Sequence, residues 1–211
     1  MTVRRILTWP DDRLLKHANQ VKNFDEDLIS LCRDMSDTMI ASFGIGLAAT
    51  QVNVQKSICI LSKTMITSLD PDPLLPEFVV LVNPKIQKIG KEKFKWQEGC
   101  LSVPNLEEEV TRDSAILLKY QDLSGKYLES ELHGIESGTV QHETDHLIGK
   151  LFIHRLKGVR RSLVFRKLQK LDRKKKKEIY TQEDDSLKIG RPKRNRSKNK
   201  KKFGKNKKRK K

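Results

Sequence analysis

The stretch QHETDH, residues 141–146, places two histidines four residues apart, with a carboxylate directly after the first. In a helix, positions i and i+4 lie on one face, so His142 and His146 can bind one metal ion between them. From the neighbouring position, Glu143 can reach a water on that metal. The spacing therefore predicts a helix that carries metal-assisted hydrolysis, and the chemistry then depends on the third ligand.

The residues downstream of this helix exclude two types of zinc peptidase. In one type a third histidine completes the pattern H-E-x-x-H-x-x-G-x-x-H, but Phe152 occupies that position and His154 comes two places too late. In another type a glutamate follows further downstream, but residues 147–177 contain none. A bare H-E-x-x-H match also arises by chance on a polar helix face, so the third ligand must be sought elsewhere.

Upstream, the segment EGCLS at residues 98–102 offers a thiol. Cys100 lies among few core-forming residues, although a free cysteine is more often simply buried. A thiolate with two imidazoles leaves one tetrahedral position open for water, which a catalytic metal site needs. The neighbouring Glu98 has two interpretations, a salt-bridge partner for Arg112 or a solvated charge on a strand.

The segment GIGLAATQ, residues 44–51, is a third candidate. A G-x-G pattern alone is weak evidence, and a tight turn before a helix is the plain alternative. The segment also lacks the third glycine of a dinucleotide-binding loop. Gly46 would allow close backbone approach by an extended ligand, and the Gln51 amide would donate to a developing oxyanion.

These three segments resemble the peptide deformylases in their order and approximate spacing. The local pattern Q-H-E-x-D-H-L-x-G matches through Gly149, and the resemblance covers about residues 1–165. It implies a hydrolase that removes the formyl group from the N-formyl-methionyl end of new polypeptides, giving formate and a free amine. The competing functions are a zinc peptidase and an RNA-binding protein on an inactive scaffold.

The resemblance assigns roles to the matching residues. It implies three metal ligands, namely Cys100, His142 and His146. The metal would be Fe²⁺, with Zn²⁺ or Ni²⁺ able to substitute. Glu143 would be the general acid and base, carrying a proton from the attacking water to the leaving amine. Gln51 and the backbone N–H of Leu101 would donate to the oxyanion.

The same resemblance predicts the substrate cleft. Gly46 would pair with the substrate backbone, and Ile45 would help to wall the methionine pocket. We also expect Glu98 and Gly99, beside the predicted thiolate, to belong to the cleft. Three features depart from the family pattern without touching a catalytic position: the acidic residues 107–109, a proline-rich loop near residues 64–77, and Gly138 and Thr139, which are small for pocket walls.

The positive charge of the chain is concentrated at its C-terminal end. From Asp172 to Lys211 there are twenty Lys and Arg against five acids, a net charge of +15. The formal total is +17, so residues 1–171 carry only about +2. Such a polar segment cannot bury enough surface to offset its ordering entropy. We therefore expect a catalytic domain over residues 1–171 and a disordered basic tail over residues 172–211.

The tail predicts a polyanionic partner, because dense positive charge binds nucleic acid through counterion release with little sequence preference. Since a deformylase substrate emerges from the ribosome, we expect contact with ribosomal RNA; the alternative is a solubilising tail without a dedicated partner. No run approaches the roughly 20 apolar residues of a membrane span. Three widely spaced cysteines argue against a disulfide framework, so we expect a soluble cytoplasmic protein.

Periodicity predicts three helices. One covers residues 25–41 with a capping box from Asn23 and Glu26, and one covers residues 138–148 with Ser137 as its cap. A third begins near Leu156 and fades at residues 174–177. Short β-branched and aromatic runs predict the strands, at residues 57–61, 78–82, around 86, 94–96, 115–120 and 127–132.

The order of these elements indicates the fold class. Strands followed by helices, without βαβ alternation, predict an α+β fold. We expect antiparallel or mixed β-sheets packed around a central metal-binding helix, followed by a C-terminal helix and the disordered basic tail. The Gly- and Ala-rich segment at residues 43–51 is too small and flexible to be predicted as a strand.

Overall fold

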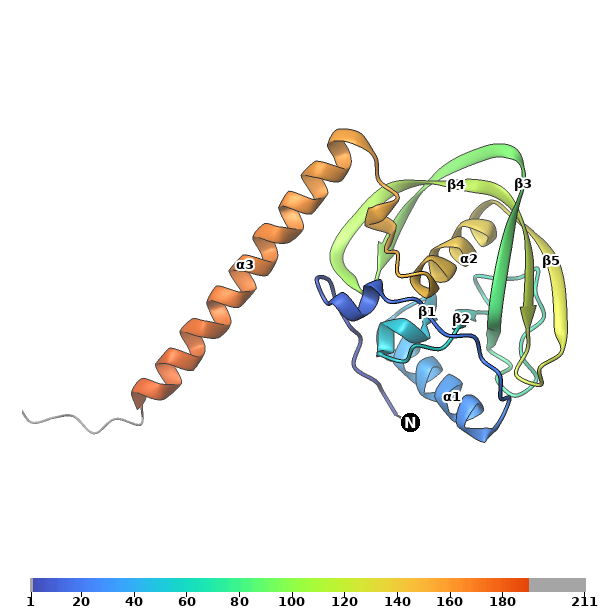
Figure 1. The fold of residues 1–211 in the computed structure, drawn as a ribbon, viewed down its shortest axis with the longest axis horizontal. Helices are drawn as coiled ribbons and strands as arrows, with labels where there is room; N and C mark the ends of the chain where they lie inside the picture. The colour runs from blue at the N-terminus through green and yellow to red at the C-terminus, as the bar shows by residue number, and fades with distance from the viewer. Residues whose placement is uncertain (1, 190–211) are drawn as a thin grey trace, which may run out of the picture. The chain divides into compact units, whose positions relative to one another are not determined.

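The structure, a computed structural model, describes residues 2–189, with side chains to residue 174. The chain divides into two compact units, of which the first spans Met1–Lys167 and the second begins at Leu168. The first unit contains the whole sheet and every residue of the predicted site (Figure 1). The boundary that the sequence predicts after residue 171 stays a prediction.

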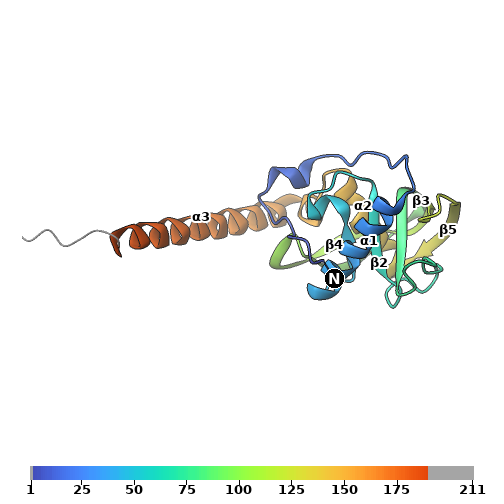
Figure 2. The same cartoon turned by 90° about the horizontal axis from the view of Figure 1, so that it is seen from below.

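The first unit is built on one antiparallel sheet of five strands, which pair in the order of the sequence. The strands are β1 (Gly46–Ala48), β2 (Ile58–Ser62), β3 (Phe78–Cys100), β4 (Val103–Gln121) and β5 (Tyr127–His133). The long strands β3 and β4 run side by side (Figures 1 and 2). Shifts in their register, such as that between Ile89 and Lys93, let them bend. The strands predicted around residues 86 and 94–96 are therefore parts of one strand.

Strand β1 corrects the sequence prediction for residues 43–51. This three-residue strand pairs Gly46 with Leu61 and Ala48 with Cys59. All three of its residues are buried, so small side chains fit where the segment is covered by its neighbours. It forms one edge of the sheet.

Alternate side chains of β2 belong to two different parts of the core, which lie on opposite faces of the sheet. Ile58 and Ile60 belong to a cluster with residues of α1 (Glu26–Ala41), such as Met35. Cys59 and Leu61 belong to a second cluster that includes Val140 of α2 (Gly134–Leu147). Because successive side chains of a strand point to opposite faces, α1 and α2 cover opposite faces of β2.

Helix α2 lies at the centre of the unit, as the fold class predicts. It contacts all five strands, and every residue from Ser137 to Leu147 is buried. In Figure 1, β3 and β4 arch around it. The helix begins four residues earlier than predicted, and the predicted cap is wrong: the Ser137 hydroxyl donates to the carbonyl oxygen of Asp113, at 2.9 Å.

Glycine stops α2 where the sequence predicts. Gly149 has φ of 67°, and a Cβ there would lie 2.2 Å from the carbonyl oxygen of Leu15. Only glycine fits this left-handed position against a neighbouring backbone. The predicted capping box of α1 is wrong, because Asp25 is the cap and its side chain accepts the N–H of Leu28 at 3.1 Å.

Three short 3₁₀ helices connect the larger elements, η1 (Asp12–Leu15), η2 (Ala49–Val52) and η3 (Phe152–His154). Helix α3 spans Gly158–Ile189, so it continues beyond the predicted end at residues 174–177. The predicted tail from residue 172 thus starts within this helix, and its residues 190–211 lie outside the described part of the chain. Within residues 2–189 there is no helix long and apolar enough to cross a membrane.

Candidate metal centre

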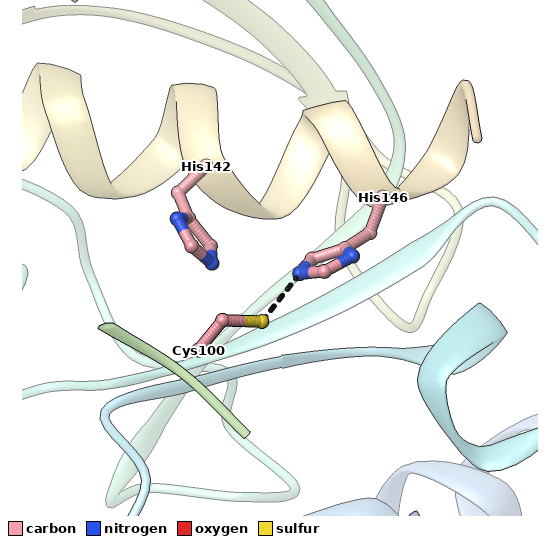
Figure 3. Close-up of side chains that lie close together, drawn as sticks. All are labelled: Cys100, His142 and His146. Atoms are coloured by element: carbon pink, nitrogen blue, oxygen red, sulfur yellow. Dashed lines mark hydrogen bonds between the residues drawn. The ribbon is translucent and has the colours of Figure 1, made fainter. Parts of the chain in front are cut away.

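Two elements bring a thiol and two imidazoles together. His142 and His146 project from the same side of α2 toward Cys100 (Figure 3), the last residue of β3. The ligand atoms of these three residues all lie within 4.8 Å of one another, and Cys100 Sγ is 3.4 Å from His146 Nε2. Both histidines are buried, while Cys100 is half-buried.

This donor set fits a divalent transition metal. One sulfur and two imidazole nitrogens within 4.8 Å of one another would supply three ligands of a tetrahedral metal and leave the fourth position to water. Burial lowers the pKa of His146 well below its ordinary value, which favours the neutral imidazole that binds metals. The three residues therefore match in chemistry and in spacing what a bound metal requires.

A hydrogen bond fixes the orientation of His142. Its Nδ1 lies 2.8 Å from Oε2 of Glu98, which leaves Nε2 to face the thiol. Burial alone would lower the pKa of His142, but its hydrogen bonds with Cys100 and Glu98 raise it well above the ordinary value. A carboxylate behind a metal-binding histidine holds the ring in place and raises its basicity.

Glu98 itself belongs to a buried ion network, so it is a salt-bridge partner of Arg112 and not a solvated charge on a strand. Arg112 donates to both of its carboxylate oxygens, at 2.7 and 2.8 Å, and also to Asp145 of α2, at 2.6 Å. The side chains of all three are at most 3% exposed. Burial would raise the pKa of Glu98, but the bonds from Arg112 and His142 lower it to about 2.

Glu143 lies against the backbone of β1. A Cβ built on Gly46 would be 2.4 Å from Glu143 Oε1, so glycine at position 46 is what makes room for the carboxylate. Burial raises the pKa of Glu143 to about 7. Its other oxygen, Oε2, is buried without a hydrogen-bond partner among the described residues. The carboxyl group is thus close-packed on one side and free to bind a ligand on the other.

Gln51 lies in η2 with its amide directed at the cysteine. Its Nε2 is 3.6 Å from Cys100 Sγ and 3.1 Å from the hydroxyl of Ser102, and its Oε1 accepts the N–H of Ala48 at 2.8 Å. The side chain is 2% exposed. Since Ala48 fixes the oxygen end, the nitrogen end of the amide is the one that faces the centre.

A cavity of about 850 Å³ leads to this centre. The predicted residues that line it include Ile45, Gly46, Gln51, Gly99 and Leu101, together with Cys100, His142 and Glu143. Glu98 also borders the cavity, but its carboxylate is occupied by Arg112, His142 and the indole N–H of Trp96. The side chain of Glu98 therefore orients His142 instead of facing a ligand.

The sequence of the chain matches the family described as polypeptide deformylase over residues 3–162. The chain belongs to the polypeptide deformylase family. Members of this family are metal-dependent hydrolases, and the match includes every residue of the centre. The competing assignment to a zinc peptidase family is thereby excluded.

Curated relatives and solved structures agree with this assignment. A peptide deformylase from Campylobacter jejuni is 40% identical over 183 residues, which are 86% of this chain and 99% of that protein. The crystal structure of a peptide deformylase from Legionella pneumophila is 35% identical, with a TM-score of 0.69 over 90% of this chain and all of that one. A Plasmodium falciparum peptide deformylase is 37% identical, with a TM-score of 0.72 over 82% and 97% of the two chains.

Several residues of this deformylase site were not predicted. Ser102 contacts Gln51, Trp96 borders the cavity, and Asp145 completes the network through Arg112. Asp145 lies inside the QHETDH stretch, so its position was a usable signal. The others depend on how β3 and β4 fold around α2, which no local pattern reveals.

Proposed function

We propose that this deformylase hydrolyses the formyl group at the N-formyl-methionyl end of newly made polypeptides, releasing formate and a free amine. The observation that carries the proposal is the meeting of Cys100, His142 and His146 within 4.8 Å beside the cavity, with the Glu143 carboxylate against Gly46. A formyl group is small, so an open coordination position beside a carboxyl group is sufficient for the reaction.

The proposed metal ligands are Cys100 Sγ and the Nε2 atoms of His142 and His146. A divalent metal in that position would act as a Lewis acid and lower the pKa of a bound water toward about 7. The family resemblance implies Fe²⁺ as the resident metal, with Zn²⁺ and Ni²⁺ as substitutes, since one thiolate and two imidazoles accept several metals. Glu98 supports this set by holding the ring of His142.

Glu143 is the proposed general acid and base. Its pKa, raised to about 7 by burial, suits a group that must both accept and release a proton near neutral pH. The carboxylate takes a proton from the attacking water and returns it to the nitrogen of the leaving amine. Its packing against Gly46 keeps it in one place during both transfers.

Gln51 and the backbone N–H of Leu101 are the proposed donors to the tetrahedral oxyanion. The Gln51 amide accepts the N–H of Ala48 at its oxygen and donates to the Ser102 hydroxyl at its nitrogen, so it needs no rearrangement when the charge develops. Leu101 follows Cys100 directly and borders the same cavity, which supports its N–H as the second donor. Loss of one such donor typically costs about 10²- to 10³-fold in rate.

The edge strand β1 is the proposed binding site of the peptide backbone. Its outer side pairs with no strand of the described sheet, so an extended peptide can add there and use the backbone of Gly46. Ile45, which borders the same cavity and is 44% exposed, would wall the methionine pocket. This arrangement directs the formyl end of the peptide toward the metal ligands.

The decisive experiment measures formate release from formyl-Met-Ala-Ser under anaerobic conditions, with the protein loaded with Fe²⁺. The wild type should release formate, and Glu143→Gln should lose at least about 10²-fold in kcat because it keeps the shape but cannot carry the proton. Metal content of the two proteins should be equal. No formate from the metal-loaded wild type would refute the proposal.

We also propose that the basic C-terminal segment tethers the enzyme to ribosomal RNA in the cytoplasm, where new polypeptides emerge. Residues 172–211 carry a net charge of +15, and such segments bind polyanions with strong salt dependence. All three cysteines are unpaired, as a reducing compartment requires. A chain truncated after Leu171 should then no longer sediment with ribosomes at low salt.

A further inference from the structure

Glu107 differs from the two acids that follow it on β4. Glu108 is buried and forms an ion pair with Arg160, while Glu109 is exposed and lies 2.8 Å from Lys95. The carboxylate of Glu107 is exposed and has neither an ion-pair nor a hydrogen-bond partner among the described residues. Its charge is therefore the one of the three that is not compensated by a neighbour.

The strand register places this charge close to the metal centre. Glu107 is paired with Gly99 of β3, the residue directly before Cys100. A Cβ on Gly99 would lie 3.4 Å from Glu107 Cγ, so the glutamate leans over a position where β3 has no side chain. Glu107 borders the cavity, whereas Glu109, two residues along the same face of the strand, does not.

The other residues of the cavity do not balance this charge. No lysine or arginine is found among the described residues that line it. The two other acids there, Glu98 and Glu143, are at most 5% exposed, and Glu98 is already paired with Arg112. Away from the proposed metal, a peptide in the cavity therefore meets one solvent-facing carboxylate and no lysine or arginine of the described residues.

We propose that Glu107 is a specificity-determining residue, which makes this enzyme prefer formyl-methionyl peptides with Lys or Arg over those with Asp or Glu in the residues just after the methionine. The inference rests on the proposed deformylase reaction and names the substrate class of that site. A basic side chain would pair with the free carboxylate, and an acidic one would be repelled by it. The long apolar stem of Lys or Arg also suits a cavity bordered by Phe43 and Leu106.

The size of the effect follows from the exposure of Glu107. An exposed charge pair typically changes an equilibrium by about two- to fivefold. Attraction of Lys and repulsion of Glu act in opposite directions, so we expect kcat/KM for the two peptides to differ by about five- to tenfold at low salt. Because Glu107 contacts no reacting atom, the difference should appear in KM while kcat stays similar.

The test compares formate release from formyl-Met-Lys-Ala-amide, formyl-Met-Gln-Ala-amide and formyl-Met-Glu-Ala-amide, and from the same set with the variable residue moved one position further. The amide ends remove the carboxylate that a short peptide would otherwise add. The wild type should prefer Lys to Glu in at least one set. Glu107→Gln should bring that ratio close to one, and Glu107→Lys should invert it. Comparing two peptides within one variant cancels any difference in the fraction of active enzyme.

Glu109→Gln is the matched control, because it removes an acid from the same face of the same strand but outside the cavity. It should keep the wild-type preference. Raising the salt to 1 M, where the Debye length is about 3 Å, should shrink the preference of the wild type. Equal rates for Lys and Glu peptides in both sets would overturn the inference about Glu107 but not the deformylase reaction. An unchanged Lys-to-Glu rate ratio in Glu107→Gln would do the same. No formate from any peptide would overturn the deformylase reaction and this inference with it.

Discussion

Gly46 has no room for a side chain beside Glu143. A Cβ at position 46 would lie 2.4 Å from one carboxylate oxygen and 2.8 Å from the carboxyl carbon of Glu143. These distances are below any normal contact, so either the strand or the glutamate has to move if position 46 gains a side chain. The G-x-G pattern suggested that Gly46 allows a ligand to approach closely. The structure gives a second reason for glycine at this position, which is the room that Glu143 needs.

Gly46→Ala should therefore displace the Glu143 carboxylate and lower kcat for formate release by about 10²-fold, because misplacing a catalytic group by about 1 Å has this effect. Overpacking should also reduce the free energy of unfolding by about 1–3 kcal/mol. Formate assays and urea titration measure the two effects. In a Glu143→Ala background, where the clash is gone, the stability loss from Gly46→Ala should largely disappear; a loss of the same size there would contradict the explanation.

Among single residues, the sequence predicted the proposed metal ligands better than the residues that surround them. The i, i+4 spacing identified His142 and His146 as a pair, and the lack of a suitable ligand downstream directed attention to Cys100. The pairing of Glu98 with Arg112 was one of two open interpretations, and the structure confirms it. The second bond of Arg112, to Asp145, could not be predicted, because it joins residues 33 positions apart through the packing of β4 on α2.

Helix α2 is buried on all sides although its sequence is polar. Its polar side chains are satisfied within the fold: Gln141 donates to the carbonyl oxygen of Asp113 at 2.8 Å, and Thr144 donates to that of Val140 at 2.8 Å. Hydrophobic periodicity cannot identify such a helix as central, because burial here follows hydrogen bonding instead of an apolar stripe.

The buried ion network should be the strongest single link between β3, β4 and α2. Replacing Arg112 by Met would leave the carboxylates of Glu98 and Asp145 buried without their common cation, although Arg155 would still bind Asp145. We expect the free energy of unfolding to fall by about 3–5 kcal/mol, as measured by urea titration. His142 would also lose part of its support, so affinity for the metal should decrease by about 10- to 100-fold.

The control is Lys119→Met on the same strand, where the side chain pairs with Glu129 at 2.7 Å and both are more than half exposed. An exposed pair of this kind contributes less than about 1 kcal/mol. Similar stability losses for the two variants would show that the network does not hold the sheet to the helix.

Strands were predicted where β-branched and aromatic residues follow one another, whereas β1 and the part of β4 before Ala115 were missed. Strand β2 and the start of β3 have the β-branched residues that indicate burial, such as Ile58, Ile60 and Val80. Strand β1 contains only Gly46, Leu47 and Ala48, and its pairing with β2 is stabilised by α1 and α2 on either side. Tertiary packing therefore makes this segment a strand in spite of its low β-propensity.

The whole chain joins a nearly neutral enzyme to a strongly basic C-terminal segment. The family match ends at residue 162, and the first compact unit ends at Lys167. The core clusters and the proposed metal ligands all lie before these points. The change in net charge, which is visible without any knowledge of the fold, predicts a boundary after residue 171, and this boundary stays a prediction. The length of α3 was not predicted, since lysine-rich sequences are compatible with both helix and coil.

A chain truncated after Leu171 should separate the two proposed activities. Because no core or site residue is removed, kcat/KM for formyl-Met-Ala-Ser should stay within about twofold of the full chain, and the free energy of unfolding within about 0.5 kcal/mol. Sedimentation with ribosomes at low salt should be lost, while the full chain should be released as salt rises, since counterion release weakens binding steeply. Loss of formate release on truncation would show that the enzyme needs its C-terminal segment, and sedimentation equal to that of the full chain would exclude the tether.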